Sequence, residues 1–277
     1  MLRDGHRTAP RAGIGLTRHQ LGFLPCFQRI ALDCLQAIQR LRLRAISGNP
    51  EAVHRIRVEL TRLRAAALFF APAMDPAGWS HIDHELRWLN SSLGKARNRD
   101  VALEALARMR NRRRAARARR NLLRSRDKAY RRLTRKLGSA RYIRLTSELD
   151  RWLSRLSSPG TDQSQQFDQI DARLREWRNE ISRKGRHLRS LRRKPLHRLR
   201  IRSKHYRYMV EALLKLDIPV SREDYSFCEI ARRVHQTLGD LRDLKQFRRA
   251  VGRRPPHYRK RKRKLMRRAA ASFRHIS

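Results

Sequence analysis

The chain has 277 residues, with 69 Lys or Arg against 24 Asp or Glu, so its formal net charge is +45. A compact protein with this charge repels itself, and a polyanionic partner would relieve the repulsion. No window approaches the roughly 18 consecutive apolar residues of a membrane span, and Met1–Gly13 lacks the apolar run of a signal peptide. We therefore expect a cytoplasmic protein that binds a polyanion and has no membrane association.

Hydrophobic periodicity predicts helices throughout the chain, and strand patterns are nearly absent. After a tail over 1–16, helices are predicted at about 17–46, 50–70 and 81–109, followed by a very basic helix that runs to about 156. A polar linker over 158–166 separates this half, 17–157, from a second half over 167–277 that includes a basic C-terminal segment. The second half is predicted to form helices at about 167–191, 195–216 and 221–251, with a short helix after Pro256. The predicted fold class is all-α.

The two halves resemble each other in two blocks, which predicts an internal duplication. Val53–Val58 matches Leu196–Ile201 at an offset of 143 residues, and Leu93–Asn98 matches Leu238–Asp243 at an offset of 145. Both blocks keep their order and spacing. One such match could arise by chance in an Arg-rich chain, whereas two in register favour duplication.

In each half, the predicted helix that contains the first block has two stripes of residues, about 100° apart around the helix axis. The apolar stripe is a predicted core face, formed by Val53, Ile56, Leu60, Leu63, Ala67 and Phe70 in one copy and by Leu196, Leu199, Tyr206, Val210 and Leu213 in the other. The polar stripe contains His54, Arg57, Thr61 and Arg64 in one copy and His197, Arg200, Lys204, Arg207 and Glu211 in the other. A stripe beside the core lies along the groove between helices, where clustered cations repel one another unless an anion joins them. A flexible phosphate polymer fits this requirement, and a solvated charged face is the alternative.

Other residues allow two interpretations. Arg62 lies on a different helical face from the polar stripe. Arg97 and Arg242 could point into the same groove or pair with Asp100 and Asp243. Gly94 and Gly239, inside predicted helices, would suit close helix–helix contact. The basic runs Arg112–Arg126 and Arg253–Arg268 could be solvated polycations, extend a phosphate-binding surface or contact nucleic acid.

No Gly-rich phosphate loop, catalytic Ser or Cys motif or paired-carboxylate motif is present, so we do not expect an enzyme. The three cysteines have no metal-like spacing and imply no disulfide framework, in keeping with a reducing compartment. His81 and His84 lack further ligands for zinc. We expect no metal and no cofactor.

These features resemble the CHAD family of α-helical domains. The resemblance covers about 17–251 and lies in Pro50–Phe70, Leu86–Val101, Leu137–Leu153, Leu196–Leu213 and Leu238–Asp243. It implies two four-helix bundles related by a pseudo-two-fold axis, with a central basic channel. It also implies non-catalytic binding of inorganic polyphosphate, often at polyphosphate granules. Some members carry a triphosphatase tunnel domain with Glu-x-Glu-x-Lys strands, which this chain lacks.

The family's basic positions carry over to His54, Arg57, Arg62, Arg64, His197, Arg200, Lys204 and Arg207, and we add Arg97 as a candidate ligand. Thr61 stands where members usually have another basic residue, and Asn98 replaces a usual Asp. The resemblance therefore implies that the second copy binds more strongly. A basic helical nucleic-acid-binding protein is the alternative, although only 6% of residues are aromatic and no stacking platform is visible. The sequence leaves the oligomeric state open.

Overall fold

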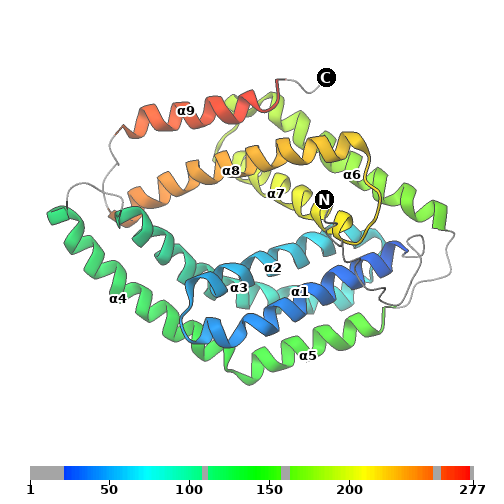
Figure 1. The fold of residues 1–277 in the computed structure, drawn as a ribbon, viewed down its shortest axis with the longest axis horizontal. Coiled ribbons are helices and arrows are strands. Elements are labelled where there is room, and N and C mark those ends of the chain that lie inside the picture. The colour runs from blue at the N-terminus through cyan, green and yellow to red at the C-terminus, as the bar shows by residue number, and fades with distance from the viewer. Residues whose placement is uncertain (1–21, 108–111, 157–162, 252–256, 275–277) are drawn as a thin grey trace, which may run out of the picture.

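The computed structural model describes residues 22–107, 112–156, 163–251 and 257–274. The predicted tail 1–16 and most of the predicted linker lie outside these ranges. The described residues form nine α-helices and two 3-10 helices, and no strand (Figure 1), which confirms the all-α prediction. The helices are α1 (Phe23–Ile46), α2 (Pro50–Phe70), α3 (Pro76–Ala107), α4 (Arg112–Leu137), α5 (Ala140–Ser154), α6 (Gln163–Arg186), α7 (Arg193–Lys215), α8 (Arg222–Val251) and α9 (Tyr258–Ala271), with η1 (Ala71–Ala73) and η2 (Leu188–Ser190).

Several predicted boundaries are wrong. The first helix begins at Phe23 and not near Thr17, because Gly22 has an extended backbone and precedes the helix as its N-cap. The helix predicted at about 167–191 begins at Gln163 and ends at Arg186.

The third helix begins at Pro76 and not near His81, because Asp75 accepts hydrogen bonds from the amides of Ala77 and Gly78 and so caps the helix start. The long basic helix predicted to run to about 156 is two helices, α4 and α5. It breaks at Gly138 and Ser139, where the Ser139 hydroxyl accepts a hydrogen bond from the Tyr142 amide.

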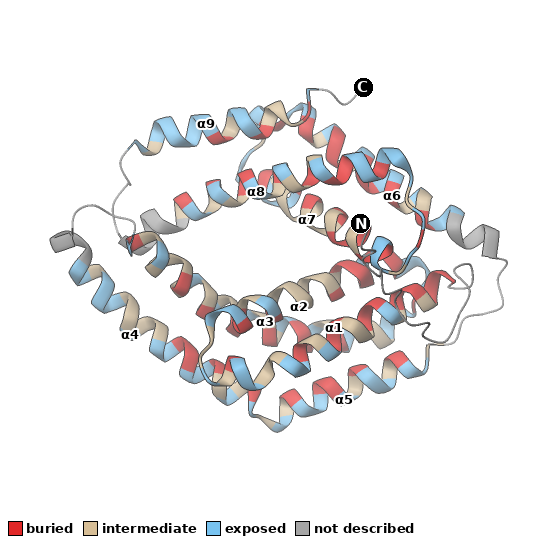
Figure 2. Ribbon diagram, viewed as in Figure 1, coloured by how far each residue is buried: buried red, intermediate tan, exposed pale blue. Residues whose placement is uncertain are grey.

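The predicted core faces of α2 and α7 are confirmed. Every side chain of both apolar stripes is buried, and several are fully inaccessible, Ile56 and Leu199 among them. Figure 2 shows buried residues along the sides by which the helices contact one another and exposed residues along the outer sides. The apolar periodicity of the sequence therefore fixes which side of each central helix remains available for polar chemistry.

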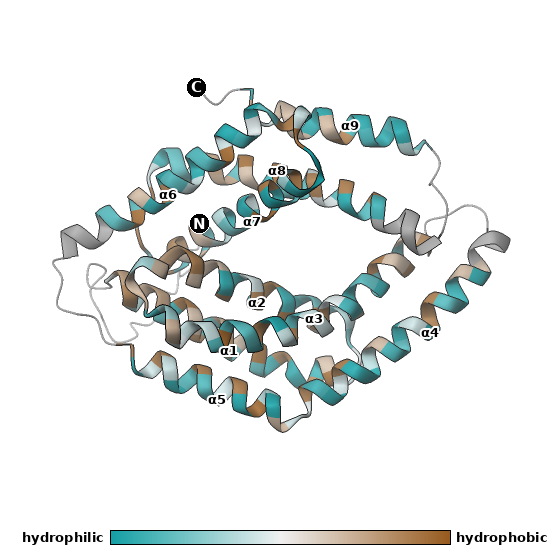
Figure 3. Ribbon diagram, turned by 180° about the vertical axis from the view of Figure 1, so that it is seen from behind, coloured by the Kyte–Doolittle hydropathy of each residue, from teal (hydrophilic) through white to brown (hydrophobic). Residues whose placement is uncertain are grey.

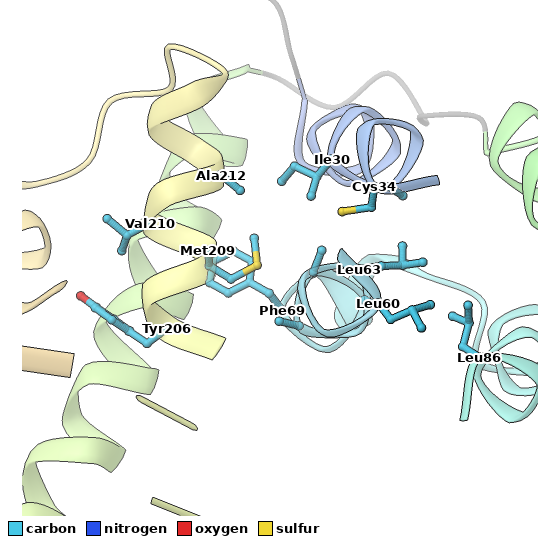
Figure 4. Close-up of a cluster of buried hydrophobic side chains, with 14 of the residues drawn as sticks. Ile30, Cys34, Leu60, Leu63, Phe69, Leu86, Tyr206, Met209, Val210 and Ala212 are labelled. Carbon is cyan, nitrogen blue, oxygen red and sulfur yellow. The ribbon is translucent and has the colours of Figure 1, made fainter. Parts of the chain in front are cut away.

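One contiguous hydrophobic core joins the two halves. In Figure 1, α1–α5 form the lower part of the molecule and α6–α9 the upper part, and α2 contacts α7 across the boundary. Phe69 of α2 packs edge-on against Trp177 of α6, with ring centroids 5.2 Å apart. Figure 4 shows Met209 of α7 beside Phe69 at the same boundary. The shared core fixes the position of α2 relative to α7.

Two of the outer helices, α4 and α9, are rich in polar residues. Figure 3 shows that α4 and α9 are predominantly hydrophilic along their length. Across the described ranges, no helix combines the length and apolarity needed to cross a bilayer.

Candidate functional site

The polar stripes of α2 and α7 lie at the contact between the two halves. The start of α2 follows from its sequence, since the Asn49 side chain accepts a hydrogen bond from the Ala52 amide at 2.9 Å and Pro50 is the first helical residue. With the apolar stripes buried on both helices, the adjacent polar stripes point along the boundary where α2 meets α7.

Four cations from both halves form the centre of the site, which we call the central cation cluster: Arg57, Arg200, Lys204 and Arg242. Burial lowers the pKa of Arg57, and the positive charges of Arg242, Arg97 and Arg200 lower it further. Burial and the charges of Arg200, Arg57, Arg207 and Arg242 lower the pKa of Lys204 to about 7. Asp243 lies beside Arg242 and Arg200; burial raises the pKa of its carboxyl, and the charges of these two arginines partly offset the rise, so this part of the cluster already contains one carboxylate. Arg57, Arg200 and Lys204 are nevertheless held partly out of water beside other cations, and a further anion would relieve both costs.

The two predicted histidines lie beside this cluster, on opposite sides of the boundary. Burial and the charge of Arg97, with smaller effects of Lys204 and Arg57, lower the pKa of His54. Burial and the charges of Arg200, Arg242 and Arg193 lower the pKa of His197. Each histidine is thus biased toward its neutral form until an anion is bound.

The remaining predicted cations have carboxylate partners. The ion pairs are Arg62 with Glu59 (2.9 Å), Arg64 with Asp83 (2.6 Å), Arg97 with Glu104 (2.9 Å) and, more loosely, Arg207 with Glu211 (3.7 Å). The predicted alternative of an Arg97–Asp100 pair is wrong, because Asp100 instead accepts hydrogen bonds from Arg126 and the Tyr130 hydroxyl. These four arginines flank the site with their charges partly neutralised.

Three cations of the site pack around the ring of Tyr208, a residue that the sequence analysis did not single out. The Arg62 and Arg207 guanidinium carbons lie 5.6 Å and 4.9 Å from the ring centroid, and Lys204 Nζ lies 5.1 Å from it. The negative face of an aromatic ring attracts cations. This packing brings Arg62 next to Lys204 and Arg207, although it belongs to a different face of α2 from the polar stripe.

His235 of α8 is a further group that the sequence analysis missed. Both ring nitrogens are buried and have no hydrogen-bond partner among the described residues, as is also true of Arg200 Nε. Burial, then the charges of Arg200, Lys204 and Arg207, lowers the pKa of His235 to about 3. A buried polar group without a partner costs about 1–3 kcal/mol. Its signal in the sequence is its position four residues before Gly239 on the helix that carries Arg242.

The spacing shared by the two Leu-Gly blocks places each glycine against an arginine of the helix that its own helix contacts. A Cβ atom added at Gly94 would lie 2.5 Å from Nη1 of Arg57. The Arg57 guanidinium therefore occupies space that a larger residue at position 94 would fill. Gly239 faces Arg200 in the matching position, but there an added Cβ would lie at 3.8 Å from Nε, an ordinary contact. The matched pairing of glycine and arginine supports the predicted duplication.

Gly94→Ala and Gly239→Ala form a matched test of this arrangement. Both replace a helical glycine, a change that favours the helix by about 1 kcal/mol. Only Gly94→Ala displaces the Arg57 guanidinium, which is the movable end of a long side chain, so the variant should fold. We expect the affinity for polyphosphate, measured by titration calorimetry, to be several-fold weaker in Gly94→Ala and unchanged in Gly239→Ala. Equal affinities in the two variants would contradict this role for Gly94.

A cavity of about 1180 Å³ lies on the side of the second half. Its walls come from α7, α8 and the first residue of α9, and they include His197, Arg200, Arg242 and Lys245. The residues lining it include none from the first half, so this cavity is less symmetric than the expected central channel. At the position that matches Lys245, the first half has Asp100, whose carboxylate accepts hydrogen bonds from Arg126 and Tyr130.

Thr61 contributes to the same asymmetry. It matches Lys204 at the offset of 143 residues, and its hydroxyl donates a hydrogen bond to the Arg57 carbonyl at 2.7 Å. The first half therefore lacks a cation at this position of the stripe, where the second half contributes the most strongly perturbed lysine.

A separate basic pocket lies between α3 and α4. Its volume is about 460 Å³, and its walls include Lys95, Arg99, Arg132 and Lys136. Lys136 and Arg141 both stack on the Trp88 ring, each 4.5 Å from its centroid. Part of the basic run Arg112–Arg126 reaches this region through Ser125, which accepts a hydrogen bond from Arg99.

Comparison with known proteins identifies the fold and the family. Two solved structures, one of them a crystal structure, have similar folds. The CHAD domain from the plant Ricinus communis has a TM-score of 0.73, 20% identity, and an alignment covering 99% of this chain and 98% of that one. PptA from Streptomyces chartreusis has a TM-score of 0.60, 17% identity, and an alignment covering 90% and 92%. No curated protein matches the sequence. The family model of the CHAD domain matches residues 29–252, and the chain therefore belongs to the CHAD domain family.

Proposed function

We propose that this protein is a non-catalytic module that binds inorganic polyphosphate and associates with polyphosphate granules. The observation that carries the proposal is the central cation cluster, in which burial and neighbouring positive charges, that of Arg242 among them, lower the pKa of Arg57 in one half and of Arg200 and Lys204 in the other. Guanidinium groups match phosphate oxygens bidentately. Family membership adds support, since the CHAD resemblance implies polyphosphate binding.

The geometry suits a narrow, flexible chain of phosphates better than a nucleic acid. Single-stranded nucleic acids bind through exposed aromatic side chains on which bases stack. Among the exposed large apolar side chains of the described residues, Tyr225 is the only aromatic one. Trp177 and Tyr206, by contrast, are buried in the core. The described surface therefore offers charge for phosphates and little for bases.

A competition assay tests the proposal. Labelled long-chain polyphosphate is bound to the protein at physiological salt and displaced by unlabelled polyphosphate, single-stranded nucleic acid or duplex, each matched in phosphate concentration. We expect polyphosphate to displace the label at the lowest concentration, and the affinity to fall steeply with added salt as counterion release requires. More effective displacement by nucleic acid would favour the alternative function.

The same sample tests the absence of catalysis. We expect no orthophosphate release from polyphosphate during incubation with Mg²⁺, because nothing in the described site provides a carboxylate cluster for metal-assisted hydrolysis. Phosphate release that depends on the central cation cluster would contradict the non-catalytic assignment.

A further inference from the structure

A second basic groove adjoins the large cavity. It has a volume of about 730 Å³ and lies between α7, α8 and α9. The two spaces share four lining residues, Arg193, Leu196, Leu241 and Lys245, so they form one continuous path. On the α9 side, the second groove is lined by Lys262, Arg263 and Arg267.

The position of α9 is fixed by apolar packing. Leu265 and Ala269 are buried against the body of the protein, and α9 contacts both α8 and η2. Just beyond α9, Phe273 occupies the space left by Gly185 of α6, where an added Cβ would lie 2.3 Å from the ring. With its apolar side held in this way, α9 presents Lys262, Arg263 and Arg267 to the groove.

The charges along this path repel one another. Burial lowers the pKa of Lys245, and the positive charges of Lys262 and Arg193 lower it further. α9 has eight Lys or Arg residues and no Asp or Glu among its 14 residues. The helix lies beyond residue 252, where the match to the family model ends. The basic path thus continues beyond the residues that the family model matches, along a helix whose apolar side packs against the protein.

We propose that α9 extends the polyphosphate path, so that a chain held by the central cation cluster continues through the shared residues and along Lys262, Arg263 and Arg267. This inference rests on the proposed function. A helix of 14 residues is about 21 Å long, so only a polymer reaches from the cluster to the far end of the groove. α9 therefore favours long chains, while a short phosphate chain fills the central cation cluster alone.

The test compares two triple variants of the same helix with equal charge change. The groove variant is Lys262→Glu, Arg263→Glu and Arg267→Glu. The control variant is Arg261→Glu, Lys264→Glu and Arg268→Glu, three exposed residues that line neither groove. Affinities are measured by calorimetry for long-chain polyphosphate and for tripolyphosphate, and melting by circular dichroism shows that each variant is folded.

We expect the groove variant to bind long-chain polyphosphate at least about tenfold more weakly than the control variant, because three phosphate contacts are lost, and all three proteins to bind tripolyphosphate alike. Equal affinity of the two variants for long chains overturns the role of α9 and leaves the proposed function intact. A wild-type protein that binds neither ligand overturns the proposed function and this inference together.

A measurement on the unmodified protein gives an independent answer. We expect saturating long-chain polyphosphate to protect Lys245 and Lys262 from an amine-reactive reagent more than it protects Lys264 on the opposite side of α9. Equal reactivity of Lys262 and Lys264 in the complex overturns the inference.

Discussion

Replacing Arg57 and Arg200 together by Glu is expected to lower the affinity for long-chain polyphosphate by more than about 100-fold, because charged contacts in a partly buried site are worth about 2–5 kcal/mol each. The two residues occupy matching positions in the two halves, and both belong to the central cation cluster. Two new carboxylates would pair with Arg242 and Lys204 and would repel phosphate.

The fold should survive this change. In the wild-type protein, Arg57 and Arg200 are repelled by Arg242, and Arg200 is attracted by Asp243. Reversing the two charges relieves the repulsion by Arg242 and loses the attraction to Asp243, so we expect a Tm close to that of the wild type. Arg44→Glu with Arg233→Glu is the matched control, since both residues are exposed on helices and line no described pocket. Binding that falls equally in the two double variants would show that net charge, and not the cluster, governs affinity.

The affinity for polyphosphate is also expected to fall as the pH rises above about 7, by at most about tenfold per pH unit for one proton. The pKa of Lys204 is about 7 in the free protein, and bound phosphate favours the charged ammonium. The pKa in the complex must therefore be higher, so binding takes up a proton between the two values. Affinity is full below pH 7 and is lost progressively above it.

Lys204→Arg isolates this effect, because a guanidinium stays charged across the same range. We expect the ratio of wild-type affinity to Lys204→Arg affinity to fall between about pH 6.5 and about pH 8.5. Because polyphosphate titrates identically in both measurements, its own protonation does not affect this ratio. Calorimetry in two buffers of different ionisation enthalpy should show greater proton uptake in the wild type. Identical pH profiles would mean that Lys204 does not titrate on binding.

The same linkage has a consequence for folding. Between pH 7 and the usual lysine pKa of 10.5, the unfolded chain holds a proton that the folded protein has released at Lys204. The free energy of unfolding of the free protein therefore gains a contribution that rises with pH across this window. Below pH 7 the repulsion is fully present, and bound polyphosphate should stabilise the protein most there.

The fold was largely readable from the sequence because apolar periodicity is a local signal. Val53, Ile56 and Leu60 mark the buried side of α2 directly, and the Asn49–Pro50 pair marks its start. The errors arose where one local signal was overlooked. Asp75 caps α3 ahead of its apolar residues, and Ser139 begins a new helix inside a basic stretch that otherwise looks continuous.

The site was readable only in part, because it depends on contacts between distant residues. Periodicity placed Arg57, Arg200 and Lys204 on the correct side of their helices, and the Leu-Gly blocks drew attention to Arg242. Periodicity could not show that Arg64 pairs with Asp83, or that Arg97 pairs with Glu104. The role of Tyr208 requires side chains from α2 and α7 around one ring, and nothing in either helix alone indicates it.

The apolar contact of Phe69 with Trp177 has a kinetic consequence. Since one core spans both halves, we expect the cations that meet a ligand to be in place before it arrives. Association should then be limited by diffusion under electrostatic attraction, with rates that respond strongly to ionic strength. Differences in affinity among phosphate chains of different length should appear mainly in their dissociation rates.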